Sequence, residues 1–443
     1  MSLYRTTFYS SETTHLFSDP YFIVSMLKAE SALAQAQAKN EVIPASAAKT
    51  ISEVCGMIHR INLDQLIQEI PLGGNAAIPL VKQLTSAVKA ADPDAAKYVH
   101  LGVTSQDIID TASMLIIKEY ITWLESKLKS IILVLIDLTQ RHRHSLMTGR
   151  TLLQHAKPIT FGLKTAYWLD SMCSLFKKIN FIKPGLLKIQ LGGAVGTGNH
   201  FIGKNIRKDF SEMLELQDSI PWHTNRSTIT EWASYLGQLS GHLGKIAKDI
   251  SLLMQTEVAE VFEGSASGKG GSSTMPHKRN PVTCTTILAN ASRTPHLVAA
   301  LYACMIQEHE RSAGMWHAEW EPMAELMQLT AGSLHQTLSL LQYLEVDTTK
   351  MIENLEITLG LIYSENIVLA LSPAIGKEKA QDLLYAATQK VLNTKMHLKK
   401  ILEQGYASNV KTLDLPSLFD PHQSLGNSSE IIDEILLNAR EII

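Results

Sequence analysis

A stretch of the 443-residue sequence from residue 103 to residue 148 contains neither glycine nor proline. Apolar residues recur in it at alternating steps of three and four: Met114, Ile117, Ile121, Leu124, Leu128, Ile131, Leu135 and Leu138. This spacing is typical of a helix that packs along one seam against another helix. A helix of that length would extend about 70 Å, which exceeds the diameter of an ordinary small domain. The chain is therefore expected to build its core from several long helices.

The same stretch also carries apolar residues away from the seam, namely Ile132, Leu133, Val134 and Ile136. A helix that is apolar on nearly every face belongs at the centre of a bundle or at a subunit interface, so we expect an oligomer. Further helical stretches cover residues 162–182, 227–263, 296–313 and 333–359, whereas alternating strand patterns are scarce. The predicted fold class is all-α.

A chain of 443 residues is too long for one hydrophobic core, so two or three packed units are expected. Segments with glycine and proline interrupt the helical stretches, and only the one at residues 264–281 is typical of a long loop. We predict an N-terminal helical domain over residues 1–109, a central long-helix bundle domain over 110–345 that carries this loop, and a C-terminal helical domain over 346–443.

The charge of the chain is nearly balanced, with 40 lysines and arginines against 43 aspartates and glutamates and a net charge of -3. This balance provides no general basic field, so we expect neither a nucleic acid nor an anionic membrane as partner. No apolar run approaches the roughly 18 residues of a membrane span, and the N-terminus lacks the pattern of a signal peptide, so a cytoplasmic location is expected. The four cysteines lie far apart without CxxC spacing, which predicts neither a zinc ribbon nor a disulfide framework.

The loop at residues 264–281 has the most unusual composition in the sequence. Four glycines fall within eight residues, three hydroxyl residues follow them, and Lys278, Arg279 and Asn280 come next. Glycines let the backbone approach a ligand closely, and free amides beside cationic side chains suit a carboxylate or a phosphate. The structural alternative is a solvated surface loop.

Two other kinds of site are disfavoured by spacing. Gly264 and Lys269 are one residue too close for a P-loop, and no GxGxxG motif occurs between a strand and a helix, so ATP and NAD are not expected. The pair His309–Glu310 lacks a second histidine at position 313, so no zinc-protease site is indicated. We expect no metal ion and no organic cofactor.

The remaining polar clusters stand at the starts of predicted helices, at residues 100–107, 149–155 and 221–226. Thr104, Ser105 and Asp107 suit the capping of the long helix. The free amides of a helix N-terminus also bind anions, so capping and carboxylate binding are compatible there. Taken singly, Arg226 and Arg311 are more often residues of surface ion pairs than ligands of a substrate.

Several segments resemble the fumarase/aspartase superfamily, which includes adenylosuccinate and argininosuccinate lyases. The run GSSTMPHKRNP at residues 271–281 resembles its signature, and TSQDIIDTA, GRTLLQHAKPITFG and LLMQTEVAEVFE match other motifs in the same order. The resemblance spans most of the chain. It implies a homotetramer of long helices in which each active site is assembled from three chains, and a β-elimination or its reverse on a small polycarboxylate.

The resemblance also implies roles for particular residues. Ser272 corresponds to the proton-abstracting serine of the superfamily, and Ser273 is its neighbour and a weaker candidate. Lys278 and Asn280, with the amides of the loop, are suited to stabilise charge on the substrate carboxylate. Expected substrate-binding residues are Asn75, His100, Thr104, Ser105, Gln106, Ser273, Met275 and the arginines Arg150, Arg226 and Arg311, while the fork of Arg279 also suits support of the loop.

Two departures from the adenylosuccinate-lyase pattern narrow the expected reaction. The general-acid histidine after GRT is replaced by Leu152, and its partner glutamate by Thr285. An amine leaving group needs a proton from such an acid, whereas the carboxylate of a lactone, with a pKa near 4, leaves unaided. The segments LGGNAAIPLVKQLT, LGGAVGTG, PWHTNR and EHERSAGMWHAEW likewise resemble the carboxymuconate-cycloisomerase branch, which closes a lactone ring during protocatechuate degradation.

Two alternatives stay open from the sequence. One is an enzyme like adenylosuccinate lyase that eliminates fumarate from a succinyl-amine, against which Leu152 and Thr285 argue. The other is a catalytically silent scaffold that keeps the fold for packing. The intact Ser272, Lys278 and Asn280 argue against a scaffold, because a structural protein has no physical need for them.

Overall fold

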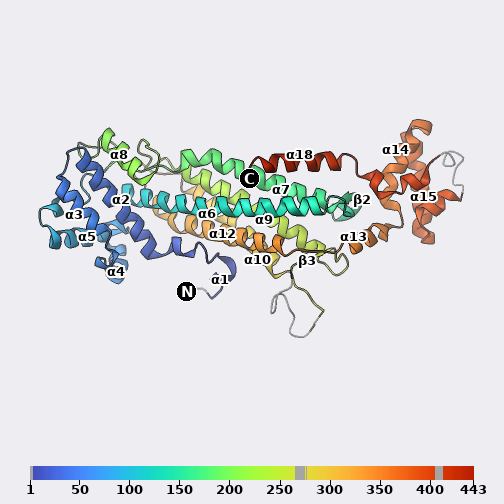
Figure 1. Cartoon of the computed structure of the whole chain (residues 1–443), viewed down its shortest axis with the longest axis horizontal. Helices are drawn as coiled ribbons and strands as arrows, with labels where there is room; N and C mark the ends of the chain where they lie inside the picture. The colour runs from blue at the N-terminus through green and yellow to red at the C-terminus, as the bar shows by residue number, and fades with distance from the viewer. Residues whose placement is uncertain (1–2, 265–274, 276, 405–412) are drawn as a thin grey trace. The chain divides into compact units, whose positions relative to one another are not determined.

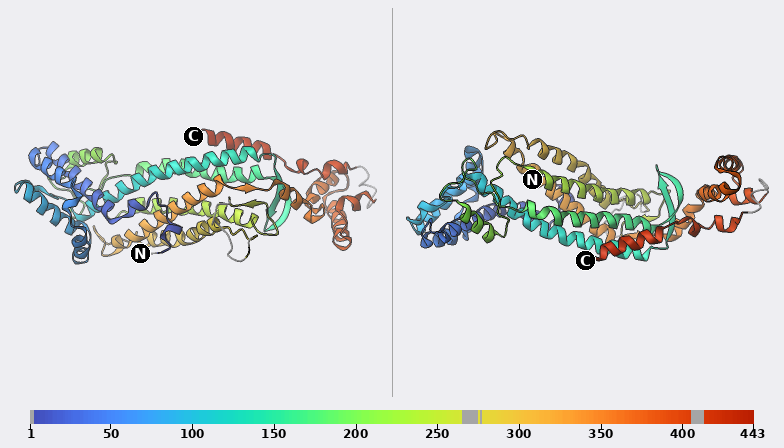
Figure 2. Two further views of the ribbon diagram at one scale, coloured as in Figure 1. Left: turned by 60° about the horizontal axis from the view of Figure 1, so that its bottom comes forward. Right: turned by 90° about the horizontal axis from the view of Figure 1, so that it is seen from above.

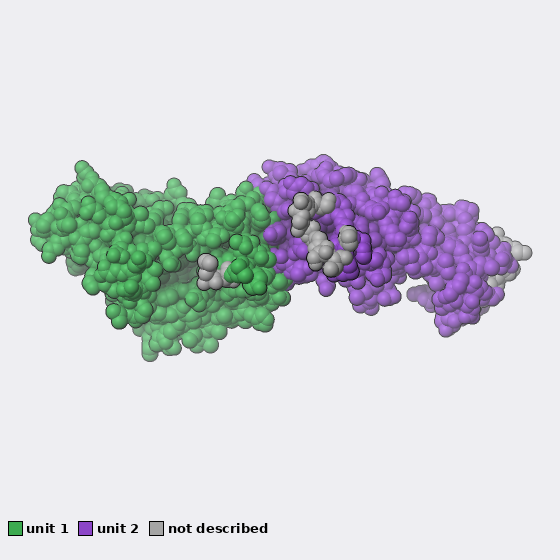
Figure 3. Space-filling model, turned by 90° about the horizontal axis from the view of Figure 1, so that it is seen from below, with its two compact units in different colours: residues 1–127, 177–243, 289–335 green, residues 128–176, 244–288, 336–443 purple. Residues whose placement is uncertain are grey.

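The computed structural model describes residues 3–264, 275, 277–404 and 413–443 (Figure 1). The described chain is dominated by helices, so the predicted all-α class is confirmed. It forms two compact units, each built from several segments (Figure 3). Unit 1 comprises residues 1–127, 177–243 and 289–335, and unit 2 comprises 128–176, 244–288 and 336–443. The three-domain division stays a prediction, because these units are made of interleaved segments.

Five long helices contribute residues to both units. They are α6 (Ser105–Arg141), α7 (Phe161–Leu186), α9 (Ser227–Leu253), α10 (Val282–Ala303) and α12 (Trp320–Gln342). The predicted long helix is confirmed as α6, and every residue of its predicted seam is at most 3% exposed. Leu133, away from the seam, is 51% exposed. The helix ends at Arg141 rather than near residue 148, because a β-hairpin begins at Leu146.

Unit 1 contains a group of shorter helices besides its parts of the long ones. They are α1 (Arg5–Phe8), η1 (Thr14–Phe17), α2 (Asp19–Lys39), α3 (Ala45–Cys55), η2 (Ile58–Arg60), α4 (Leu63–Gly73), α5 (Ala77–Ala91), η3 (Ala95–Tyr98), α8 (Lys204–Leu214) and α11 (Met315–Ala318). Helix α2 packs against both α3 and α8, and the blue and green ribbons of these segments lie side by side in both views of Figure 2. Ser18 caps α2 by accepting a hydrogen bond from the Tyr21 amide.

A glycine allows one close approach in unit 1. A Cβ atom at Gly332 of α12 would lie 1.9 Å from the carbonyl oxygen of Phe8. Only glycine therefore lets the N-terminal segment lie against this helix. Asn290 of α10 strengthens the contact, because its Nδ2 donates to the carbonyl oxygens of Phe8 and Leu329.

Unit 2 contains two small antiparallel sheets and the C-terminal helices. Strand β1 (Leu146–Thr151) pairs with β2 (Gln154–Thr160), and β3 (Val261–Phe262) pairs with β4 (Glu345–Val346). The helices are α13 (Thr348–Leu355), η4 (Glu356–Thr358), η5 (Leu361–Tyr363), α14 (Ser364–Ile375), α15 (Lys377–Thr394), α16 (Leu398–Glu403), α17 (Leu415–Leu418), η7 (Pro421–Ser424) and α18 (Ser428–Arg440). Ile367, Ala380, Val391 and Leu398 belong to a hydrophobic core formed by α14, α15 and α16.

Within the described ranges, no single helix combines the length and the apolarity of a membrane span. Residues 348–358 and 361–375 meet those criteria only when joined across a bend of 81°.

Candidate active site

The start of α6 brings together two residues that were predicted to bind the substrate. Arg311 donates from Nη1 to the hydroxyl of Thr104 at 2.7 Å and from Nη2 to the carbonyl oxygen of Ala194 at 3.0 Å. Thr104 directly precedes α6, and Ser105, its first residue, is partly exposed. The free amides of a helix start and a guanidinium thus lie side by side in unit 1, an arrangement that suits a carboxylate.

Asp107 organises the backbone around this helix start. Its fully buried carboxylate accepts hydrogen bonds from the amides of Thr104, Gly192 and Gly193, at 3.1, 2.9 and 2.8 Å. His223 lies 2.7 Å away through Nε2, which therefore carries the proton that it donates to the carboxylate. Asp107 does cap α6, as the sequence predicted, and it also fixes the 192–198 segment against the helix.

Asn75 and His100 also belong to unit 1. Asn75 is 9% exposed, and its Oδ1 accepts from the amides of Ala77 and Ile78 at 3.1 and 3.3 Å, so it caps α5. His100 precedes α6 by five residues, and its Nδ1 lies 2.5 Å from Oε1 of Glu30 on α2. Sequence analysis did not identify Glu30, because nothing local to α2 distinguishes it from a surface acid.

The side chains of Gln106 and Arg226 lie in a buried charge cluster with Asp110 and Glu319. Arg226, 3% exposed, donates to Asp110 at 2.8 Å through Nη1 and to Glu319 at 2.6 Å through Nη2, and its Nε also contacts Glu319. Gln106 donates to Asp110 at 3.2 Å and to the carbonyl oxygen of His223 at 2.9 Å. Burial raises the pKa of Glu319, although its hydrogen bonds with Arg226 and the charge of Arg226 lower it. The cluster thus occupies all three nitrogens of the arginine.

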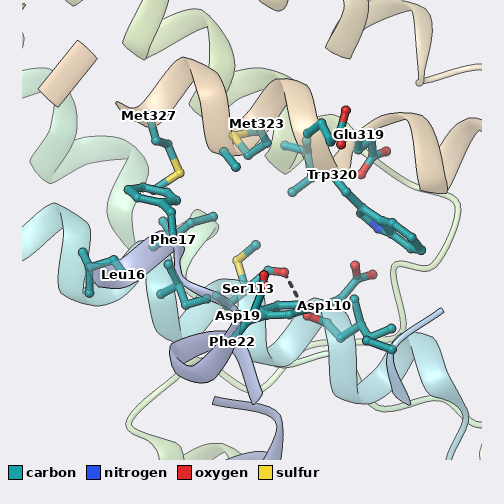
Figure 4. Close-up of a pocket in the computed structure, with 18 of the residues that line it drawn as sticks. Leu16, Phe17, Asp19, Phe22, Asp110, Ser113, Glu319, Trp320, Met323 and Met327 are labelled. Carbon is teal, nitrogen blue, oxygen red and sulfur yellow. Dashed lines mark hydrogen bonds between the residues drawn. The ribbon is translucent and has the colours of Figure 1, made fainter. Parts of the chain in front are cut away.

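An apolar cavity of about 370 Å³ adjoins this cluster (Figure 4). Phe17, Met323 and Met327 lie around one end, and Asp110 and Glu319 lie at the other. The wall also includes the acids Asp19 and Glu321. Arg226 also lines the cavity but offsets only one of these four carboxylate charges, so the wall would repel a polyanion and the cavity is not the expected polycarboxylate site.

Arg150 of unit 2 forms a forked ion pair with a buried acid. Its Nη1 and Nη2 donate to the two oxygens of Glu260 at 2.9 and 2.7 Å, and Glu260 is completely buried. Asn354 of α13 donates to the same carboxylate at 2.8 Å. The fork of Arg150 is therefore engaged with a structural acid. Burial and the charge of Arg150 lower the pKa of the neighbouring His155.

The ends of the glycine-rich loop are held in unit 2 by a set of side-chain contacts. Glu263 accepts from the amides of Thr283 and Cys284 at 3.1 and 2.8 Å, so it caps α10. Arg279 donates to the carbonyl oxygen of Glu263 at 2.8 Å, lies 2.8 Å from Glu345 and stacks over the ring of Phe262 at 4.6 Å. The structure therefore places Arg279 in support of the loop ends.

The remaining predicted residues are placed as follows. Lys278 and Met275 are exposed, Asn280 is partly exposed, and the amide of Lys278 donates to the carbonyl oxygen of Met275 at 3.1 Å. Ser272 and Ser273 lie outside the described residues. Leu152 stands at the turn between β1 and β2, with a φ of 49° and 96% exposure.

Thr285 is exposed on α10, where its hydroxyl donates to the carbonyl oxygen of Pro281 at 2.8 Å.

The predicted site residues that the structure describes are divided between the two units. Unit 1 holds Asn75, His100, Thr104, Ser105, Gln106, Arg226 and Arg311, and unit 2 holds Arg150, Met275, Lys278 and Asn280.

Comparison with known proteins gives consistent matches along the chain. A family model described as Lyase matches residues 5–295, and one described as Adenylosuccinate lyase C-terminus matches residues 360–435. The chain is 44% identical to 3-carboxy-cis,cis-muconate cycloisomerase of Acinetobacter baylyi, over 99% of this chain and 98% of that protein. The enzyme of the same name from Pseudomonas aeruginosa is 40% identical, over 98% and 95%. A crystal structure of beta-carboxy-cis,cis-muconate cycloisomerase from Acinetobacter calcoaceticus matches with a TM-score of 0.91 and 41% identity, covering 98% of this chain and 100% of that one.

Proposed function

The chain belongs to the lyase family of the fumarase/aspartase superfamily, and on that premise we propose that it closes 3-carboxy-cis,cis-muconate into 4-carboxymuconolactone during protocatechuate degradation. Among the reactions of the superfamily, the choice of ring closure rests on the residue at position 152. There the apolar Leu152 stands in place of the general-acid histidine of adenylosuccinate lyases. An internal carboxylate that adds to or leaves a neighbouring carbon requires no such acid. Thr285, in place of the partner glutamate, supports the same choice.

The ring closure forms one carbon–oxygen bond and one carbon–hydrogen bond. A carboxylate oxygen of the substrate adds to one carbon of a double bond, and the adjacent carbon, which bears another carboxylate, receives a proton. Negative charge accumulates on that second carboxylate before the proton arrives. Ser272 delivers the proton in this direction and abstracts it in the reverse direction. Lys278 and Asn280 stabilise the charge, a contribution that is worth several kcal/mol when the donors are fixed and water is excluded.

The start of α6 supplies the binding site for another carboxylate of the substrate. Thr104, Ser105 and the first amides of the helix donate hydrogen bonds, and Arg311 and His100 add positive charge. Asn75 holds the start of α5 in the same unit. Arg150, Arg226 and Gln106 are already engaged by buried acids, so we assign them to the support of the site rather than to the substrate.

The active site is completed between chains, in a cytoplasmic homotetramer with three chains at each site. Exposed apolar side chains support this assembly. Leu133 of α6, Tyr167 of α7 and Tyr302 of α10 are 51%, 51% and 50% exposed. Packing long helices of neighbouring subunits together would remove these surfaces from water.

A spectrophotometric assay tests the proposed reaction. Purified protein is mixed with 3-carboxy-cis,cis-muconate, and the loss of diene absorbance is followed, with adenylosuccinate and argininosuccinate as comparison substrates. We expect turnover of carboxymuconate alone. Turnover of adenylosuccinate alone would identify a succinyl-amine lyase, and turnover of none of the three would favour a scaffold.

Arg311→Lys should raise KM for carboxymuconate by about tenfold and leave kcat nearly unchanged. Lysine keeps the charge but loses the planar fork that holds Thr104 and Ala194 together, so a bound carboxylate loses one charge-assisted hydrogen bond. Steady-state kinetics measure both constants. Arg207→Lys is the matched control, because Arg207 pairs with Asp218 through an exposed contact in the same unit. A normal KM in Arg311→Lys would remove Arg311 from the carboxylate site.

A further inference from the structure

Helix α2 holds the turn that leads into α6 with two buried side chains. The turn includes His100 and Gly102, whose φ angles of 58° and 80° lie in the left-handed region. Gln37 donates through Nε2 to the carbonyl oxygens of Leu101 at 2.8 Å and Phe201 at 3.0 Å. Glu30 precedes Gln37 by seven residues, so both lie on one face of α2. This face therefore sets the position of the turn.

Glu30 binds the imidazole that the turn carries. Its Oε1 lies 2.5 Å from Nδ1 of His100, and the two side chains are 1% and 18% exposed. In the part of the chain that the structure describes, Glu30 forms no ion pair with any other residue. A buried carboxylate without a counter-charge is strongly unfavourable, so the pair favours a protonated imidazole with Nδ1 as donor. Nε2 then carries a second proton, and it makes no hydrogen bond with the described residues.

We propose that Glu30 is a positioning residue that keeps His100 protonated and presents its Nε2–H to a carboxylate of the substrate bound at the start of α6. The identity of that substrate rests on the proposed function, whereas the need for an anionic ligand does not. Two side chains then supply positive charge to the bound carboxylate in different ways. Arg311 supplies a permanent charge beside Thr104, and His100 supplies a charge that depends on Glu30.

The electrostatic surroundings of His100 agree with this assignment. Burial by itself lowers the pKa of His100, but the charge of Glu30, the hydrogen bond to it and the charge of Asp107 outweigh burial and raise the pKa above its ordinary value. Glu30 acts from α2 and Asp107 from α6. Burial, and to a smaller extent the charge of Glu30, raise the pKa of the Cys55 thiol on α3, so this thiol stays neutral. Since the pKa of His100 is raised, its positive charge persists above the ordinary value near 6.5 and is lost only as the pH rises through the raised value.

Binding of a saturated tricarboxylate tests the proposal without any catalytic step. Affinity for tricarballylate is measured by titration calorimetry between about pH 5.5 and 8.5, for wild type, Glu30→Gln, His100→Gln and the double variant. In Glu30→Gln, burial without the neighbouring charge lowers the pKa of His100. We therefore expect this variant to bind about tenfold more weakly near pH 7.5, with a smaller difference near pH 5.5. His100→Gln should bind weakly throughout, and Glu30→Gln should have no further effect in that background.

Several outcomes would overturn the proposal. They are an equal loss of affinity in Glu30→Gln at every pH, an undiminished effect of Glu30→Gln in the His100→Gln background, and a wild type that does not bind tricarballylate. If Glu30→Gln fails to fold, the comparison of wild type with His100→Gln tests the proposal. Identical pH profiles of tricarballylate affinity in these two proteins would exclude a charged His100 at the ligand. A wild type that binds tricarballylate but does not turn over carboxymuconate would reject the proposed function and leave the role of Glu30 intact.

Discussion

Ser272→Ala should lower kcat for carboxymuconate by about 10³-fold and change KM little, because the hydroxyl acts in proton transfer and not in binding the ground state. A serine hydroxyl is a weak acid and a weak base. Its contribution therefore depends on a cation close to its oxygen and on exclusion of water when the substrate is bound. Lys278 is the expected cation. Stopped-flow and steady-state measurements of diene loss give the rate constants.

Ser273→Ala is the matched control, since it removes the same hydroxyl group one residue away in the same loop. We expect this variant to keep kcat within about tenfold of wild type. A large loss in Ser273→Ala with normal turnover in Ser272→Ala would exchange the two roles. Normal turnover in both would reject serine as the proton-transferring group and with it the mechanism. Unchanged helical circular dichroism in both variants is needed to compare their rates.

The central helix could be predicted from the sequence because its signal is local and repeats. Eight apolar residues at alternating steps of three and four predicted the buried seam of α6, and all eight are buried. The end of the helix could not be placed in the same way. The hairpin of β1 and β2 turns through Leu152 and Leu153, which have φ angles of 49° and 65°, whereas such turns usually contain asparagine and glycine. Gly149 and Pro158 mark a break in the helical pattern, but the two turn residues themselves carry no turn signal.

The candidate site was predictable where residues act in their own segment and less so where they act across the fold. Thr104 and Asp107 were predicted to cap the long helix, and Asp107 accepts from the amide of Thr104. Arg226 was predicted to bind the substrate because a polycarboxylate needs several cations. Its acid partners could not be recognised from the sequence. Asp110 is 116 residues away and Glu319 is 93 residues away. Whether an arginine meets a ligand or a buried acid is decided by such tertiary contacts.

Arg226→Met should lower the free energy of unfolding by about 3–5 kcal/mol, the usual cost of removing one partner of a buried ion pair. Asp110 and Glu319 are 4% exposed each and would lose their shared counter-charge, while methionine fills a similar volume. Arg141→Met is the control, because Arg141 pairs with Asp137 on the surface and should contribute at most about 0.5 kcal/mol. Urea denaturation at fixed protein concentration measures both variants.

The pH dependence of this loss separates a structural role of Arg226 from a role in substrate binding. Burial already raises the pKa of Glu319, and removal of the arginine takes away the hydrogen bonds and the charge that oppose burial. The folded variant therefore binds protons more readily than the unfolded chain, so its deficit should shrink as the pH falls and grow as the pH rises. Adding Glu319→Gln to Arg226→Met should recover part of the stability at neutral pH, since one uncompensated charge disappears. Wild-type stability in Arg226→Met together with a raised KM would instead assign this arginine to the substrate.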